Sequence, residues 1–373
     1  MKEKKNLGLI IILIAIALLL GAGGFFLGRA VSEKEYNAER ELSIKLNKSD
    51  LAGLGEIEGP IYVTGHKTPD TDTVGCAIGY AALLRALGYD ARAAVLGEIN
   101  QETRYVLEKG GIETPELLLD AAGLNIVLVD HSEYAQSADG LEEANIISII
   151  DHHGDGSVTT GNQLIYDARP LGAAATIVWM RCRNYGVEPD EKSAFALLGA
   201  ILSDTNGLKE GRYTDADEEA VKALQKLAGV KDVKEFYQEM YKASISYEGF
   251  TDEEIYLSDY KEYETSAKSF AIGSINAYDE TIAKDLSARI KAVLQKGVPD
   301  AQADMLFAQI SIYHDDLNIN YLVASDEAGE EVLRAAFPDA VFDGTAFRIE
   351  PGVSRRTVLV PAITDVLEAY PKE

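Results

Sequence analysis

Three short motifs rich in aspartate and histidine limit what this chain can fold into, because each follows an apolar segment typical of a β-strand. The motifs are Gly65–Asp72, Asp130-His131 and Asp151-His152-His153, and they hold four of the five histidines in the 373-residue chain. Helix-like segments separate the strands, a pattern that predicts a parallel sheet whose strands end at one edge. We therefore expect the three motifs to converge at that edge.

The alternation of strands and helices indicates an α/β fold. We expect a doubly wound, mostly parallel sheet in a domain over residues 60–243 and a smaller C-terminal α/β domain over residues 244–373. The strands predicted for the second domain cover residues 268–275, 305–312, 321–324 and 357–361.

An uncharged, mostly apolar segment over residues 6–27 follows three lysines at the N-terminus. Its length is close to the roughly 20 residues that span a bilayer core. We therefore expect a cytoplasmic tip and a transmembrane helix over residues 1–30, then a polar stalk over residues 31–59. Basic residues ahead of the span favour a single-pass protein with an extracytoplasmic body. A cytoplasmic orientation and cleavage after Ala30 stay open.

The net charge of −26, from 35 basic and 61 acidic residues, argues against nucleic acid as a bulk binding partner. A small anionic substrate remains compatible with this charge, because metal ions and a few basic side chains reverse the potential locally. The two cysteines, Cys76 and Cys182, lie in apolar segments and are more typical of buried thiols than of a disulfide.

Aspartate and histidine ligands without thiolates suit Mn²⁺, Mg²⁺, Co²⁺ or Zn²⁺. The candidate metal ligands are too many for one ion, and they are His66, Asp70, Asp72, Asp130, His152 and Asp204. Two ions about 3.5–4 Å apart, sharing one carboxylate, can hold a hydroxide between them and clamp an in-line phosphoryl displacement. Any one of these aspartates could instead end a strand or cap a helix. Their joint occurrence favours the metal site.

Together these motifs resemble those of the DHH phosphoesterase superfamily, and most closely those of its family II, manganese-dependent inorganic pyrophosphatases. The resemblance covers the chain from about Pro60 onward. The segments that match the family are Gly65–Asp72, Leu128–His131, Ile150–His153, Leu202–Thr205 and the C-terminal substrate loop Gly352–Arg356.

The resemblance implies hydrolysis of inorganic diphosphate to two phosphates, with two Mn²⁺ ions as cofactors. Co²⁺ and Mg²⁺ stay open as alternatives, and a further Mg²⁺ would arrive with the substrate. His66 and Asp70 would bind the first ion. The second ion would be bound by Asp72, His152 and Asp204. Asp130 would bridge the two ions.

The remaining roles implied by the resemblance concern catalysis and substrate binding. His153 would contact the substrate and protonate the leaving phosphate, and Asp130 and Asp151 would be the other catalytic residues. Asp151 and His131 would also orient the metal ligands from behind. The residues that would bind phosphate oxygens, in a cleft between the two domains, are His153, Lys242, Arg355 and Arg356. A homodimer stays open.

Two other functions stay open at this point. The same metal chemistry could act on another phosphoanhydride or on a phosphodiester, such as a short oligonucleotide or a cyclic dinucleotide. Superfamily members with those substrates usually carry a Gly-Gly-His motif, and no histidine follows Gly23-Gly24 or Gly110-Gly111. A non-catalytic sensor of phosphate or metal is the third possibility, and the complete set of candidate ligands disfavours it.

Overall fold

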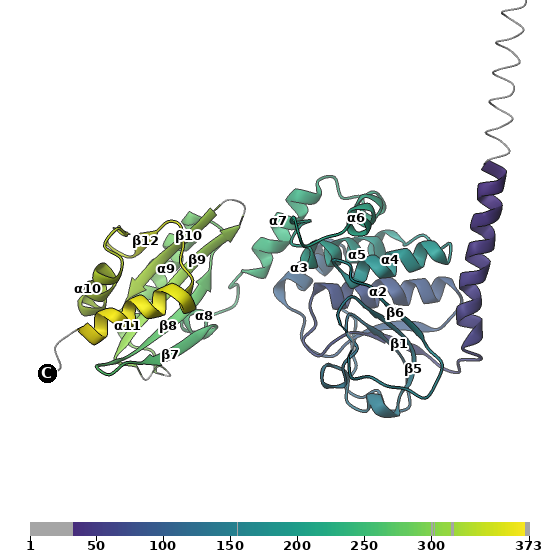
Figure 1. The fold of residues 1–373 in the computed structure, drawn as a ribbon, viewed down its shortest axis with the longest axis horizontal. Coiled ribbons are helices and arrows are strands. Elements are labelled where there is room, and N and C mark those ends of the chain that lie inside the picture. The colour runs from purple at the N-terminus through teal and green to yellow at the C-terminus, as the bar shows by residue number, and fades with distance from the viewer. Residues whose placement is uncertain (1–32, 155, 300, 302, 315–316, 370–373) are drawn as a thin grey trace, which may run out of the picture. The chain divides into compact units, whose positions relative to one another are not determined.

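The computed structural model describes residues 33–369 apart from residues 155, 300, 302, 315 and 316 (Figure 1). The chain divides into two compact units, which meet in sequence between Tyr241 and Lys242. The first described element is a helix over residues 33–53. Leu51, near the end of this helix, is buried in the main core of the first unit.

The structure corrects the prediction of a single-pass membrane protein with an extracytoplasmic body. Within the described part of the chain, no helix is long and apolar enough to cross a membrane. Residues 6–27, from which the span was predicted, lie outside the described residues.

The first unit contains a six-stranded parallel sheet, which confirms that part of the predicted fold. The strand order is β3-β2-β1-β4-β5-β6, so the chain reverses its direction of travel across the sheet between β1 and β4. Ligands in such sheets bind at the carboxyl ends of strands near that reversal. The strands are β1 (Ile61–Thr64), β2 (Ala91–Val95), β3 (Glu116–Leu117), β4 (Asn125–Val129), β5 (Asn145–Asp151) and β6 (Ile165–Ala168).

One face of this sheet packs against helices, and the core between them includes Val63, Val127, Ile150 and Ile201. Small residues allow α2 and α5 to approach closely, since a Cβ atom added at Gly75 would lie 2.7 Å from the carbonyl oxygen of Ala196. The further helices of this unit are α2 (Thr71–Ala86), α3 (Gln101–Lys109), α4 (Ala174–Asn184), α5 (Glu191–Asp204) and α6 (Asp215–Leu227). The next helix, α7 (Val233–Ser244), begins in this unit and ends in the second.

The opposite face of the sheet differs from the predicted double winding, in which helices cover both faces. Ile126, Leu128 and Ile149 pack there against loop residues and against Leu141 of the short 3₁₀ segment η2 (Leu141–Glu143). Among the described residues, this apolar cluster includes no member of an α-helix. The connection from β4 to β5 covers only residues 130–144 and holds η2 and a second short segment, η1 (Tyr134–Gln136). It is at the lower limit of length for a helical crossover.

The second unit contains a mixed six-stranded sheet with the order β11-β12-β10-β9-β8-β7, in which only β8 and β9 pair in parallel. One face carries α9 (Glu280–Lys296), and the other carries α10 (Glu327–Ala336) and α11 (Val360–Ala369). The remaining elements are α8 (Asp252–Leu257), β7 (Tyr260–Glu264), β8 (Ser269–Asn276), β9 (Met305–His314), β10 (Leu317–Ala324), β11 (Val341–Phe342) and β12 (Phe347–Ile349).

The strand predicted over residues 357–361 is wrong. A π-helical turn, Arg355–Leu359, leads directly into α11. Leu359, Ile363 and Leu367 recur every four residues and are buried in the core beneath this helix. The helical spacing of these apolar side chains outweighs the strand preference of the β-branched residues between them.

Candidate metal centre

The loop from β1 to α2 brings the first set of predicted ligands together. Asp70 is the N-cap of α2, and its Oδ1 accepts a hydrogen bond from the backbone N–H of Thr73 at 2.9 Å. Its Oδ2 lies 3.4 Å from Nε2 of His66. Asp70 therefore stabilises the helix with one oxygen and leaves the other facing the histidine.

Asp130 follows β4 and lies between two imidazole rings. Its Oδ2 is 3.4 Å from Nε2 of His66, and its Oδ1 is 3.3 Å from Nε2 of His152. The hydroxyl of Thr73 donates a hydrogen bond to Oδ2 at 2.8 Å. The backbone of Asp130 has a φ of 62°, in the left-handed region. Such strain costs about 1–3 kcal/mol and occurs preferentially at functional sites.

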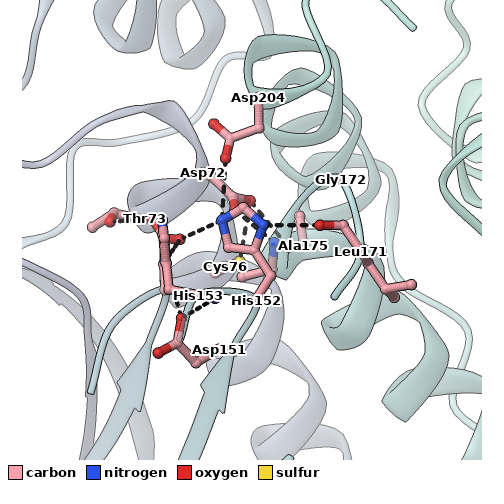
Figure 2. Close-up of polar contacts among 12 residues, drawn as sticks. Asp72, Thr73, Cys76, Asp151, His152, His153, Leu171, Gly172, Ala175 and Asp204 are labelled. Atoms are coloured by element: carbon pink, nitrogen blue, oxygen red, sulfur yellow. Dashed lines mark hydrogen bonds and ion pairs between the residues drawn. The ribbon is translucent and has the colours of Figure 1, made fainter. Parts of the chain in front are cut away.

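His152 follows β5 and has a defined tautomer. Its Nδ1 lies 3.1 Å from the carbonyl oxygen of Leu171, as Figure 2 shows. Because a carbonyl oxygen only accepts hydrogen bonds, Nδ1 carries a proton and neutral His152 presents the lone pair of Nε2. That nitrogen faces carboxylates, with Oδ2 of Asp204 at 3.4 Å and Oδ2 of Asp72 at 4.0 Å.

Asp72 is fully buried and is held by the beginning of α4. The backbone N–H groups of Ala174 and Ala175 donate to its two oxygens at 2.7 and 3.0 Å. The thiol of Cys76 donates to Oδ1 at 3.4 Å (Figure 2). The partial positive charge of a helix N-terminus stabilises such a carboxylate. The role of these two N–H groups could not be predicted from residue types, because every residue except proline carries a backbone N–H.

The clustered carboxylates perturb one another strongly. Burial, followed by the charges of Asp130 and Asp70, raises the pKa of Asp204 to about 7. Burial acts to lower the pKa of His66, but its contacts with Asp130 and Asp70 dominate and raise it to about 10. Burial and the charge of Asp130 also raise the pKa of Asp72. These shifts express an excess of negative charge that cations would neutralise.

The geometry of the described residues fits metal ions. The ligand atoms of each of three groups lie within 4.8 Å of one another, and Asp130 belongs to all three. Among the described residues, Oδ1 of Asp130 and Nε2 of His152 are buried without a hydrogen-bond partner. A cation would satisfy these atoms, and oxygen and imidazole ligands suit Mn²⁺. The groups are His66, Asp70 and Asp130; Asp72, Asp130, His152 and Asp204; and Asp130, His152 and His153.

His153 and Asp151 form a pair beside this cluster. The side chain of His153 is 59% exposed, and its Nδ1 lies 3.1 Å from Oδ1 of Asp151. This hydrogen bond, opposed by burial, raises the pKa of His153. Asp151 is fully buried and also accepts from the backbone N–H of His153 at 3.0 Å.

His131 lies behind the cluster. Its ring nitrogens lie 3.1 Å from the carbonyl oxygen of Val129 and 2.9 Å from the hydroxyl of Ser137. Its ring meets that of His66 edge-on, with the centroids 6.3 Å apart. The contact of His131 with a predicted ligand is therefore through ring packing.

A cavity of about 380 Å³ opens over these residues, and Glu133 and Gln136 of the β4–β5 loop also line it. These two polar side chains were not among the predicted site residues. The predicted cations Lys242, Arg355 and Arg356 belong to the second unit. There, Arg355 donates to the backbone oxygen of Asp259 at 2.7 Å and to its Oδ1 at 2.8 Å. Lys242 and Arg356 are exposed.

Comparison with known proteins agrees with this geometry. Residues 60–203 match the model of the DHH family, N-terminal domain, and residues 238–366 match the DHHA2 domain. The chain is 35% identical over 310 residues to a probable manganese-dependent inorganic pyrophosphatase of Lactobacillus acidophilus, which covers 83% of this chain and 99% of the relative. It is 34% identical over 304 residues to the manganese-dependent inorganic pyrophosphatase of Methanothrix thermoacetophila, covering 81% and 97% of the two chains.

A solved structure gives the same result. The putative family II inorganic pyrophosphatase of Methanococcus jannaschii is 32% identical, with a TM-score of 0.51. The match covers 83% of this chain and 100% of that chain. The relatives are thus aligned over nearly their whole length, and the metal-dependent chemistry in their names agrees with the cluster around Asp130. The chain belongs to the family of manganese-dependent inorganic pyrophosphatases and is a DHH/DHHA2 phosphohydrolase.

Proposed function

We propose that this chain hydrolyses inorganic pyrophosphate to two phosphate ions. The observation that carries the proposal is the position of Asp130, whose two oxygens face His66 on one side and His152 on the other. A carboxylate shared between two ligand groups can hold two metal ions close together, as two-metal phosphoryl transfer needs. The relatives that align over nearly their whole length are named manganese-dependent inorganic pyrophosphatases, one of them as probable.

In this proposal, His66, Asp70 and Asp130 hold one Mn²⁺, and a second Mn²⁺ is held by Asp130 with Asp72, His152 and Asp204. Bound there, the ions would lower the pKa of a water molecule and neutralise the charge of the substrate. The protein fixes the ligands beforehand. The carbonyl of Leu171 orients His152, and the N-terminus of α4 orients Asp72. This preorganisation reduces the cost of assembling the site when the substrate binds.

We assign acid catalysis and substrate contact to His153. Asp151 accepts a hydrogen bond from Nδ1, which leaves Nε2 of the exposed ring available to a phosphate in the cavity. The raised pKa of His153 keeps a larger fraction of the ring protonated near neutral pH, as a donor to a leaving phosphate requires. Asp130 and Asp151 complete the proposed catalytic set.

Lys242, Arg355 and Arg356 are proposed to bind phosphate oxygens. Their support is chemical: they are cations of the second unit, and two of them lie in the π-helical turn that Ser354 caps. Lys242 and Arg356 are exposed, whereas the side chain of Arg355 is only 14% exposed. Arginine can bind two phosphate oxygens at once through its planar guanidinium. A phosphate at Arg355 would compete with its present partner, Asp259.

Phosphate release by the purified chain tests the proposed function. Pyrophosphate, tripolyphosphate and a cyclic dinucleotide should be compared, each with Mn²⁺, Co²⁺ and Mg²⁺. We expect pyrophosphate with Mn²⁺ to give the highest turnover. No release from pyrophosphate with any of the three metals would refute the proposal, and preferential cleavage of the dinucleotide would assign the site to a phosphodiester.

A further inference from the structure

Glu102 connects two segments that carry proposed metal ligands, although it belongs to none of the metal motifs. It lies in the first turn of α3, and its Oε2 accepts hydrogen bonds from the hydroxyl of Thr71 at 2.7 Å and from that of Ser203 at 2.5 Å. Thr71 lies between Asp70 and Asp72 in the sequence, and Ser203 directly precedes Asp204. One carboxylate oxygen therefore links the beginning of α2 to the end of α5.

The hydrogen bonds around Glu102 have a fixed direction. A carboxylate only accepts, so the hydroxyl of Thr71 donates to Glu102 and must itself accept from Thr103, 3.0 Å away. Thr71 and Thr103 are 2% and 1% exposed, so water does not compete for these groups. The side chain of Asn100 caps α3 through the backbone N–H of Thr103 at 2.8 Å. The position of Glu102 is thus defined by the fold of α3.

Local stability accounts for only part of the role of the carboxylate at this position. Glu102 is partly buried in the first turn of α3, where the partial positive charge of the helix favours a carboxylate. That effect does not require a partner, whereas Oε2 of Glu102 accepts from two hydroxyls that adjoin proposed ligands. Burial raises the pKa of Glu102, and the hydrogen bonds from Ser203 and Thr71 oppose that effect. We therefore relate this group to a requirement of the adjacent site.

That requirement follows from where Asp204 lies. It is the last residue of α5, and the partial negative charge of a helix C-terminus is unfavourable for a carboxylate. Close packing holds α5 against α2 at Ala196 and Ala200, but both residues lie at least one turn before Asp204. The proposed co-ligand His152, whose Nε2 is 3.4 Å from Asp204, comes from a different element. The hydroxyl of Ser203, bonded to Glu102, provides a link to α2 one residue away.

We propose that Glu102 is a positioning residue that fixes the end of α5 against the start of α2, and thereby sets the spacing of Asp204 from Asp70 and Asp72. The inference rests on the proposed two-metal function. It assigns no contact of Glu102 with metal or substrate. It predicts that the acceptor oxygen of Glu102 is needed for tight binding of the ion assigned to Asp72, His152 and Asp204.

Four variants distinguish the loss of the acceptor oxygen from the loss of charge and from general effects on α3. Glu102→Ala removes the acceptor, whereas Glu102→Gln keeps an oxygen that accepts from both hydroxyls but loses the charge. Glu108→Ala removes an exposed carboxylate from the same helix and is the matched control. Ser203→Ala removes one of the two hydroxyls and leaves Glu102 in place, so it tests the link if Glu102→Ala fails to fold.

Calorimetric titration of the metal-free full chain with Mn²⁺ gives the readout, because it does not depend on catalysis. We expect two Mn²⁺ ions in the wild-type chain, and a dissociation constant for one of them at least tenfold higher in Glu102→Ala. Glu102→Gln should stay within about threefold of wild type, Ser203→Ala should fall between the two, and Glu108→Ala should match wild type. The fluorescence of Trp179, the only tryptophan, verifies that each variant is folded.

Wild-type Mn²⁺ affinity in both Glu102→Ala and Ser203→Ala would overturn the proposal. Equal losses in Glu102→Ala and Glu102→Gln would also overturn it, because they would make the charge, not the acceptor, responsible. A wild-type chain that binds two Mn²⁺ ions but releases no phosphate from pyrophosphate would refute the proposed substrate while leaving the role of Glu102 supported by the binding data. A wild-type chain that binds no Mn²⁺ would overturn both.

Discussion

Asp217→Ala should destabilise the first unit and weaken its metal site, although Asp217 touches none of the proposed ligands. Asp217 is fully buried in the first turn of α6. Its carboxylate accepts from the backbone N–H of Gly172 at 2.9 Å, the hydroxyl of Thr176 at 2.6 Å, and the backbone N–H and hydroxyl of Thr214, both at 2.7 Å. It therefore ties α6 to the segment that leads into α4.

The expected loss of stability can be built up from these donors. Thr176 is fully buried, and an unsatisfied buried donor costs about 1–3 kcal/mol. Loss of the capping box at Thr214 adds about 1 kcal/mol. Gly172 is half-buried and adds about 1 kcal/mol, because water can replace part of its hydrogen bond. The sum is about 4 kcal/mol, a large fraction of the 5–15 kcal/mol that stabilises a typical domain.

Urea unfolding followed by tryptophan fluorescence measures this loss in the relevant unit. Trp179, the only tryptophan, is 6% exposed and lies in α4, the helix that Asp217 anchors through Thr176. The metal-free chain should be used, so that weaker Mn²⁺ binding does not contribute to the midpoint. Asp215→Ala, which removes an exposed carboxylate from the same helical turn, is the control and should cost less than about 1 kcal/mol.

The same variant should weaken Mn²⁺ binding, because Gly172 follows Leu171, whose carbonyl orients His152. Asp217→Asn should have an intermediate effect, since its amide keeps one acceptor oxygen but turns an NH₂ group toward donors. An unfolding midpoint for Asp217→Ala equal to that of Asp215→Ala would refute the reasoning. A lower midpoint with unchanged Mn²⁺ affinity would refute the predicted effect on the metal site but not the predicted loss of stability.

Three further predictions concern the centre itself. Asp130→Asn should keep the fold, because asparagine tolerates a left-handed φ. In a calorimetric titration, the number of bound Mn²⁺ ions should fall below two. Two tightly bound ions would contradict the bridging role. His153→Ala should keep both ions but lower kcat for pyrophosphate by about 10²-fold or more, because a proton donor is lost. A phosphate-release assay measures this, and an unchanged kcat would show that His153 takes no part in the reaction. In the metal-free folded chain, Asp204 ionises only as the pH rises through about 7, whereas the unfolded carboxyl is ionised above about pH 4. The folded state therefore loses stability as the pH rises from about 4 to about 7. Mn²⁺ must displace that proton, so its affinity should be about tenfold higher at pH 8 than at pH 6 from Asp204 alone, and a flat pH dependence would contradict the raised pKa.

The parts of the site that the sequence predicts are those set by strand ends. The motifs after β1, β4 and β5 converge because parallel strands place their carboxyl ends on one edge, and the motif residues could be read directly from the chain. The supporting contacts could not be predicted in this way. The N–H groups of Ala174 and Ala175 and the carbonyl of Leu171 are backbone groups, and their role depends on where α4 begins.

Two errors in the predicted fold also have physical causes. Thr357, Val358 and Val360 are β-branched and favour a strand locally, but the apolar spacing from Leu359 to Leu367 is helical and extends beyond that short window. A doubly wound sheet needs helices on both faces, but the connection from β4 to β5 has few apolar residues and forms only two 3₁₀ segments. In both cases tertiary packing decided the outcome.

The two oxygens of Asp70 face different partners, which has a consequence for metal exchange at the proposed site. Oδ1 accepts from the N–H of Thr73, so only Oδ2 faces His66 and the ion proposed there. Loss of that ion would therefore leave the start of α2 capped, and the loop that carries His66 would not have to refold before another ion entered. Exchange would be a local event at the side chains of His66, Asp70 and Asp130, so the ion bound there would depend on the supply of divalent metals around the protein.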